Sequence, residues 1–230
     1  MSKTKHQEVK MLFHIFHIKN GWTIKFLLMV ISLLTVLYSK PAFANQACSI
    51  VEFNGSDAKL RYTNIQGNAS SRTLSQSNSV RGWSYKGRLA SYVIFNGSES
   101  VVIVQEFNPD TGQFGRKLAT INISNSDSIR GWDWDESKGI ASFLFANSSG
   151  TFVAVQEFSL QGFGSRIATV KLSNSALSKL GSSWTWNATL AEYTLNGRTK
   201  VQYFDSDSFG SVLPNESRHV GNNIVGRSCY

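Results

Sequence analysis

Most of this chain repeats itself at a period of about 50 residues. Residues 80–107 read VRGWSYKGRLASYVIFNGSESVVIVQEF, and residues 129–158 read IRGWDWDESKGIASFLFANSSGTFVAVQEF. A looser copy, LGSSWTWNATLAEYTLNGRTKVQYF, occupies residues 180–204. Such a repeat predicts a propeller, a solenoid or an array of small β motifs, because each unit must stack on its neighbours to bury a core.

Each copy divides into four segments with the alternation typical of β-strands. In the second copy we expect strands at residues 129–134, 140–145, 151–158 and 166–172. Gly, Asn, Ser and Asp fill the gaps between the segments. Asn96-Gly97 and Asn196-Gly197 each separate two apolar runs, and Asn-Gly is the strongest short hairpin signal. No segment has a sustained helical period, so we expect an all-β protein.

The two ends of the repeat complete one copy between them. Residues 48–56, CSIVEFNGS, match residues 90–98, ASYVIFNGS, so the first copy begins at its second strand. The final residues, NNIVGRSCY, resemble NSVRGWSY without its Trp and supply a first strand. A sheet built from both termini closes a ring and removes exposed edges. We therefore expect a four-bladed β-propeller that is closed by N- and C-terminal strands.

Two segments resemble a known kind of blade. WSYKGRLAS at residues 83–91 and WDESKGIAS at residues 134–142 resemble the W-S-P-D-G-K-x-x-A core of TolB-type and WD-like β-propeller blades. NPDTGQFGRKLATI at residues 108–121 resembles the D-x-T-G hairpin and following strand of other propellers. The resemblance covers nearly all of the chain after residue 44 and implies a propeller.

Residues 177–210 are also similar to a βγ-crystallin Greek-key motif, with Phe204 and Phe209-Gly210 in its aromatic turn. This alternative implies two Greek-key domains and a calcium-binding protein, although the copies lack the paired Asn/Asp of the calcium segment. The strand shared between the termini favours one closed ring.

The first 44 residues have the features of a secretory signal. Two lysines precede an apolar run at residues 26–38, and AFA at residues 42–44 forms a small-x-small cleavage site. The run is short for a membrane span, with an uncleaved anchor as the alternative. We expect residues 1–44 to be a signal peptide and residues 45–230 to be a single repeat-built domain, exported to the periplasm or medium of a bacterium.

The charge of the chain is concentrated in this leader. The whole sequence carries +8, but six of the 23 basic and one of the 15 acidic residues lie before residue 45, which leaves +3. The remaining basic residues are scattered, so neither a nucleic-acid partner nor an anionic membrane surface is indicated.

Only two cysteines occur, Cys48 and Cys229, close to the two ends of the expected domain. An even pair in an exported chain predicts a disulfide, with two independent thiols as the alternative. A loop this long contributes on the order of 4–5 kcal/mol in the entropic account.

Catalytic and metal-binding residue types are sparse after the leader. His219 is the only His there, no G-x-S-x-G motif occurs, and the Cys and His content disfavours zinc. Asp133 with Asp135, and Asp205 with Asp207, could hold calcium or act as paired acids in glycoside hydrolysis. Solvated turn residues are the plainer interpretation. We expect no cofactor, with calcium left open.

The tryptophans give the best binding signal. Trp83, Trp134 and Trp184 each lie seven residues before an Ala that the copies share, namely Ala90, Ala141 and Ala191, so we assign them to the core. Trp132 and Trp186 do not align, and we expect them to be exposed platforms for a sugar or apolar ligand.

Arg81 and Arg130 recur beside the Trp strand. They could face a ligand at the mouth of the ring or pair with acids between blades, and we favour pairing.

Together these features predict a non-catalytic binding or interaction module, lectin-like or protein-binding, with a glycan or a protein as its partner. Two alternatives remain: a glycan-active hydrolase that uses Asp133, Asp135 or Asp207, and a calcium-binding βγ-crystallin-like protein.

Overall fold

A computed structural model describes residues 48–64, 67–86, 88–178, 181–195, 197–213, 218–219 and 223–229 of the chain. These residues form 17 β-strands and no helix, which confirms the all-β expectation. Within these ranges no helix is long and apolar enough to cross a membrane. The expected signal peptide and its cleavage site fall outside the described residues, so that assignment stays a prediction.

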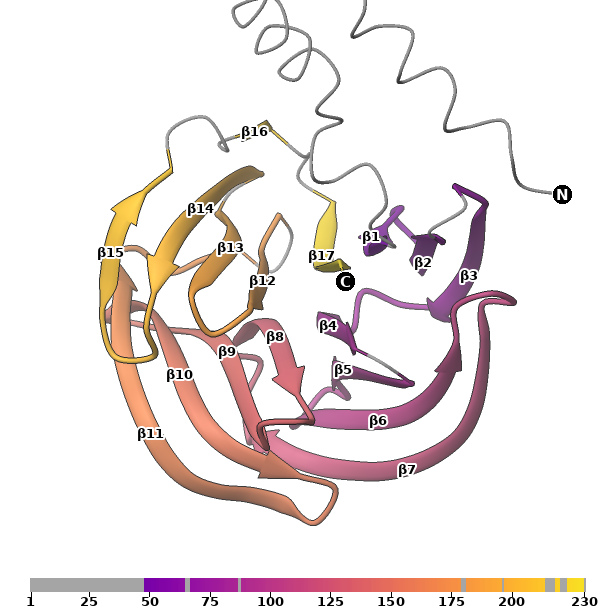
Figure 1. Ribbon diagram of the computed structural model, residues 1–230, viewed down its shortest axis with the longest axis horizontal. Coiled ribbons are helices and arrows are strands. Elements are labelled where there is room, and N and C mark those ends of the chain that lie inside the picture. The colour runs from indigo at the N-terminus through magenta and orange to yellow at the C-terminus, as the bar shows by residue number, and fades with distance from the viewer. Residues whose placement is uncertain are drawn as a thin grey trace, which may run out of the picture. The chain divides into compact units, whose positions relative to one another are not determined.

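The strands form four antiparallel sheets, which surround one axis as the blades of a β-propeller (Figure 1). Each blade is a meander whose first strand lies nearest the axis. Blade 2 consists of β4 (Val80–Lys86), β5 (Leu89–Phe95), β6 (Ser100–Asn108) and β7 (Gln113–Ser124). Blade 3 consists of β8 (Ile129–Asp135), β9 (Ile140–Asn147), β10 (Gly150–Ser159) and β11 (Gly162–Ser173). Blade 4 consists of β12 (Ser183–Trp186), β13 (Leu190–Leu195), β14 (Arg198–Phe204) and β15 (Phe209–Val212), with β16 (Arg218–His219) paired to β14.

Blade 1 is built from both ends of the repeat, as the sequence predicts. Its strands are β17 (Ile224–Cys229), β1 (Cys48–Phe53), β2 (Ala58–Thr63) and β3 (Ala69–Ser75), in that order from the axis outward. In Figure 1 the yellow β17 lies beside the indigo β1. The pairing of β1 with β17 sets Cys48 opposite Cys229. The chain is therefore a four-bladed propeller closed by its terminal strands.

The Greek-key alternative is wrong. Within blades 2, 3 and 4, consecutive strands are hydrogen-bonded neighbours, whereas a Greek key requires a strand that returns past its neighbours. Residue 130, where a linker between two domains would lie, is inside β8. The four strands expected in the second copy are confirmed, and each extends one to a few residues further than the pattern indicated.

A buried Trp joins each of three blades to the blade before it. The innermost strands β4, β8 and β12 each carry a Trp whose side chain is at most 1% exposed. Its indole N–H donates to a Ser hydroxyl on the second strand of the preceding blade. These bonds are Trp83 to Ser49, Trp132 to Ser91 and Trp184 to Ser142, each 2.8 Å long. Each of these three blade interfaces thus combines aromatic packing with one satisfied buried donor.

Glycine allows the innermost strands to approach each other closely. A β-carbon added to Gly82 would lie 2.6 Å from the Cβ of Trp132, and one added to Gly131 would lie 2.7 Å from that of Trp184. The same holds at Gly226, where the separation is 2.5 Å. A side chain at any of these three positions would overlap the next blade, so glycine is what allows the strands to lie this close without a shift.

The seam between blade 4 and blade 1 departs from this pattern. Arg227 stands where the other blades have the Trp and forms an ion pair with Glu192, which replaces the Ser. Ser183 replaces the Gly and donates to Thr194 at 2.8 Å. Thr194 also shares a 2.9 Å hydrogen bond with Thr199, where the other blades carry aliphatic residues. Among the described residues, clusters of buried apolar side chains join blades 1 and 2, 2 and 3, and 3 and 4, but not 4 and 1.

The glycine contacts predict a sharp difference between two Gly→Ala substitutions. Gly131→Ala should destabilise the fold by about 1–3 kcal/mol, because the new methyl group overlaps the backbone of the next blade. Gly115→Ala is the milder control, since its methyl group would lie 2.8 Å from a Glu106 carboxylate oxygen and 3.0 Å from the Glu106 Cβ, both side-chain atoms of an exposed residue rather than backbone. Thermal melts of both variants measure the effect. Equal melting temperatures would show that the innermost strands do not require this approach.

Candidate binding face

One face of the propeller carries two sets of turns. Because neighbouring strands run antiparallel, the first turn and the last hairpin of each blade lie at the same end of its sheet. We call this end the hairpin face. Among the described residues of blades 2 to 4, it comprises residue 88, the turns at residues 136–139 and 187–189, and the hairpins at residues 109–112, 160–161 and 205–208.

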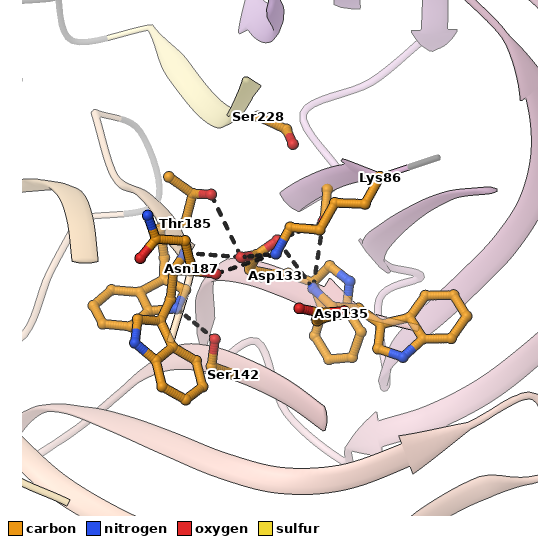
Figure 2. Close-up of polar contacts among 12 residues, drawn as sticks. Lys86, Asp133, Asp135, Ser142, Thr185, Asn187 and Ser228 are labelled. Carbon is orange, nitrogen blue, oxygen red and sulfur yellow. Dashed lines mark hydrogen bonds and ion pairs between the residues drawn. The ribbon is translucent and has the colours of Figure 1, made fainter. Parts of the chain in front are cut away.

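Asp133 occupies the axis just inside this face. Its side chain is 2% exposed and lies on β8 (Figure 2). One carboxylate oxygen accepts hydrogen bonds from the Ser84 hydroxyl at 2.5 Å and the Trp134 N–H at 3.0 Å. The other accepts from the Lys86 ammonium at 2.9 Å and the Trp186 N–H at 2.8 Å. The carboxylate therefore holds the innermost strands of three blades together, and Lys86 balances its charge.

The position of Asp133 is one of four equivalent positions around the axis. The residues at this position on the other innermost strands are Ser84, Thr185 and Ser228. Figure 2 shows that the side chains of Thr185 and Lys86 reach Asp133. Ser228 donates to the Tyr85 carbonyl at 2.9 Å. A cavity of about 10 Å³ remains beside this polar ring, enough for about one water molecule. The axis is filled rather than open to a ligand.

The other candidate aspartates lie in separate turns. Burial raises the pKa of Asp135, but hydrogen bonds from Ser137 and Lys138 hold it below its usual value. The Ser137 hydroxyl lies 2.6 Å and the Lys138 ammonium 3.1 Å from its carboxylate. Asp205 and Asp207 belong to the exposed hairpin of blade 4. The described residues contain no group of three His, Cys, Asp or Glu that could hold a metal ion.

The expectation that Trp132 is exposed is wrong. Trp132 is completely buried and is equivalent to Trp83 and Trp184, whereas Trp134 lies two residues further along β8. Counting seven residues back from the shared Ala gives the wrong Trp in blade 3, because the turn between β8 and β9 is longer than the corresponding turns of the other blades. The Arg-Gly-Trp sequence shared by β4 and β8 identifies the correct alignment.

Trp186 is partly buried at the wall of the small axial cavity. Its indole N–H donates to the Phe204 carbonyl at 2.9 Å, and its ring meets that of Phe204 edge to face. Only part of its ring is available to a ligand, so it is a weaker platform than its sequence position suggested.

Arg81 and Arg130 are buried at the opposite end of the innermost strands from the hairpin face. Both contact Asp127, which the sequence analysis did not single out. The Arg81 guanidinium binds its carboxylate at 2.6 and 3.0 Å, and an Arg130 nitrogen lies 3.4 Å away. Burial lowers the pKa of Arg130, and the charge of Asp127 opposes that effect. Two roles were considered for Arg81 and Arg130, contact with a ligand and pairing with an acid, and the structure shows the pairing with an acid.

A groove of about 660 Å³ lies on the hairpin face in blade 2. Aromatic rings and charged side chains both line it: Tyr85, Arg88, Glu106, Phe107, Asp110 and Phe114. The hairpin at residues 109–112 contacts blade 1, since Gly112 lies against the ring of Tyr62 on β2. A second hollow, of about 370 Å³, lies at the corresponding place in blade 4. Sequence reasoning missed both.

Comparisons with known proteins return propellers. No protein-family model matches the chain, and no curated protein matches it. Three solved structures among the matches are TolB from Acinetobacter baumannii, the WD40 domain of Toxoplasma gondii coronin, and Chaetomium thermophilum Sqt1 bound to the N-terminus of ribosomal protein L10. The expected resemblance to TolB-type and WD-like propellers is confirmed. The assignment of four blades rests on the strand order of this chain itself.

These similarities are distant. Sequence identities are 12% to TolB, 13% to coronin and 12% to Sqt1, with TM-scores of 0.42, 0.39 and 0.38. The alignments cover 77%, 60% and 79% of this chain. They cover only 44%, 35% and 48% of the other three chains, so this chain spans less than half of each.

The burial of the tryptophans predicts a ranked mutant series. Trp132→Ala should cost about 3–5 kcal/mol, as should Trp83→Ala, because each removes a fully buried ring and the hydrogen bond that its indole N–H donates to a Ser hydroxyl. Trp186→Ala should cost clearly less, because its ring is only partly buried. Urea unfolding of the three variants measures the ranking. A larger loss for Trp186→Ala than for Trp132→Ala would contradict the assignment of Trp132 to the core.

Proposed function

We propose that the chain is an exported, non-catalytic binding module that recognises a protein partner through the hairpin face. The observation that carries the proposal is the groove in blade 2. Its volume of about 660 Å³ lies within the range of roughly 300–1,000 Å³ found for binding pockets. A propeller supplies a rigid scaffold on which such a groove keeps its shape.

The lining of the groove suits a segment of polypeptide. Phe114 is partly buried, whereas Tyr85 and Phe107 are only 1% and 5% exposed and form the deep part of the aromatic floor. Arg88 and Asp110 provide both signs of charge at the rim. Protein interfaces combine a buried aromatic centre with a polar rim in this way. The aromatic floor is itself held rigid, since the rings of Tyr85 and Phe107 pack edge to face with centroids 5.0 Å apart.

The alternative of a hydrolase gains little support from the acids it would use. The oxygens of Asp133 are occupied by hydrogen bonds from three blades, and Asp135 is paired with Lys138. A glycosidase needs two carboxyl groups that are free to flank a sugar bond. These contacts support binding without turnover, and the hydrolysis screen below tests this directly.

A crosslinking experiment tests the groove. A photoreactive residue at Thr111 should give a discrete adduct with one partner protein, whereas the same residue at Thr120, on the outer strand of blade 2, should not. Arg88→Glu should abolish the Thr111 adduct, and Lys200→Glu, an exposed charge on blade 4, should leave it unchanged.

Two outcomes would reject the proposed function. One is equal crosslinking from Thr111 and Thr120, which would mean that contact is unspecific. The other is turnover of any glycan in a hydrolysis screen that Asp135→Asn removes, which would establish an enzyme.

Export also accounts for the cysteine pair. We propose that Cys48 and Cys229 form a disulfide, because the ladder between β1 and β17 sets them directly opposite each other. Alkylation of the unreduced protein should label no cysteine in an intact-mass spectrum. Reduction should then destabilise the fold by on the order of 4–5 kcal/mol, with Cys48→Ser/Cys229→Ser as the matched control. Two labelled cysteines before reduction would refute the bond.

A further inference from the structure

Blade 4 lacks a carboxylate–backbone hydrogen bond that blades 2 and 3 share. There, Glu106 and Glu157 precede a buried Phe, and their carboxylates accept backbone N–H groups of the adjacent outer strand at 3.1 and 2.9 Å. In blade 4 the equivalent residue is Tyr203, which has no carboxylate to play this part. The substitution therefore removes a local hydrogen bond and places an aromatic ring on the hairpin face.

The ring of Tyr203 is open to solvent. Its side chain is 45% exposed, although most aromatic side chains of this protein are packed in the blade interfaces. The neighbouring position on β15 is Gly210, which lies against the base of Tyr203 and has no side chain to cover the ring. Among the described residues, no ring contact of Tyr203 is present comparable to those of Tyr193 and Phe204 beside it. A flat apolar surface is thus left uncovered.

Two strained turns surround this ring. Ala188 has a φ of 73° and Ser206 a φ of 89°, and they are the only described residues other than Gly with positive φ. The matching turn of blade 3 and the matching hairpins of blades 2 and 3 use glycine for this conformation, namely Gly139, Gly112 and Gly162. A non-Gly residue held in this region costs backbone energy, and such positions cluster at functional sites.

Hydroxyl and carboxylate groups line the rest of the hollow. It has a volume of about 370 Å³, and Thr189, Asp205 and Ser208 face it together with Tyr203. The Ser208 N–H donates to one Asp205 oxygen at 2.9 Å, and the Ser208 hydroxyl lies 3.0 and 3.1 Å from the two oxygens. These bonds lower the pKa of Asp205. No Lys or Arg is among the described residues that line it. The hollow therefore offers hydrogen-bond acceptors and one stacking surface, and no cation for an anionic ligand.

We infer that the hollow in blade 4 is a saccharide-binding site, in which a neutral sugar ring stacks on Tyr203 and donates a hydroxyl to Asp205. A pyranose presents an apolar C–H face beside several hydroxyl groups, which matches one aromatic face beside a carboxylate. The inference rests on the proposed function as a binding module, but it concerns another blade and another class of ligand than the groove in blade 2.

Titration of the purified protein with defined oligosaccharides tests the site. We would use the tetrasaccharides of glucose, N-acetylglucosamine, mannose and galactose, with heats of binding as the readout. At least one should bind saturably. Tyr203→Ala and Asp205→Asn should each weaken it about tenfold, which corresponds to about 1.4 kcal/mol. Tyr203→Phe should bind like the unmodified protein, because the stacking face remains.

The matched control is Ile167→Ala, which removes an equally exposed apolar side chain, 47% exposed, from the outer strand of blade 3. It should change neither binding nor the melting temperature. The inference is overturned if none of the four sugars binds, or if binding survives Tyr203→Ala. Crosslinking from Thr111 does not involve this hollow, so failure of the sugar site and failure of the proposed function give different results.

Discussion

The close contact between innermost strands is the constraint on which the rest of this propeller depends. A ring of only four blades brings these strands so near the axis that Gly82, Gly131 and Gly226 touch the backbone of the next blade. The same approach seats each Trp against the preceding blade, within reach of a Ser hydroxyl. Packing and hydrogen bonding are therefore set together, because neither forms unless the glycine contact does.

The fourth seam shows what happens where this constraint is relaxed. Between blades 4 and 1 the Trp–Ser pair is replaced by Arg227 and Glu192, and two threonines stand where aliphatic residues pack elsewhere. Partly buried ions contribute less net stability than an apolar cluster, because their desolvation offsets their attraction. Closure at this seam must then rely more on β17, whose ladder with β1 completes blade 1.

The sequence was sufficient to predict the elements but not their side-chain environments. Four strands per copy, the circular offset and the closing role of the termini all follow from a repeat that any correct alignment reveals. Trp132 was assigned to the surface because a longer turn shifted the count, although Arg-Gly-Trp preserved the true register. The partnership of Asp127 with Arg81 and Arg130 has no signal in the repeat, because Asp127 lies in a connection between blades. The groove depends on how the hairpin of blade 2 meets Tyr62 of another blade, which no local pattern encodes.

The candidate sites occur where the copies differ, and this has a physical reason. Positions shared by all copies form the blade interfaces, so a substitution there disturbs the ring. The hairpins make fewer such contacts and can vary freely. In blade 3 the hairpin is short, and Leu160 and Phe163 fold back onto the core, which fills the space. In blade 2 a longer hairpin leans on blade 1 and leaves the groove, and in blade 4 Tyr203 replaces a structural Glu and opens the second hollow. Repetition builds the scaffold, and the departures from it leave room for ligands.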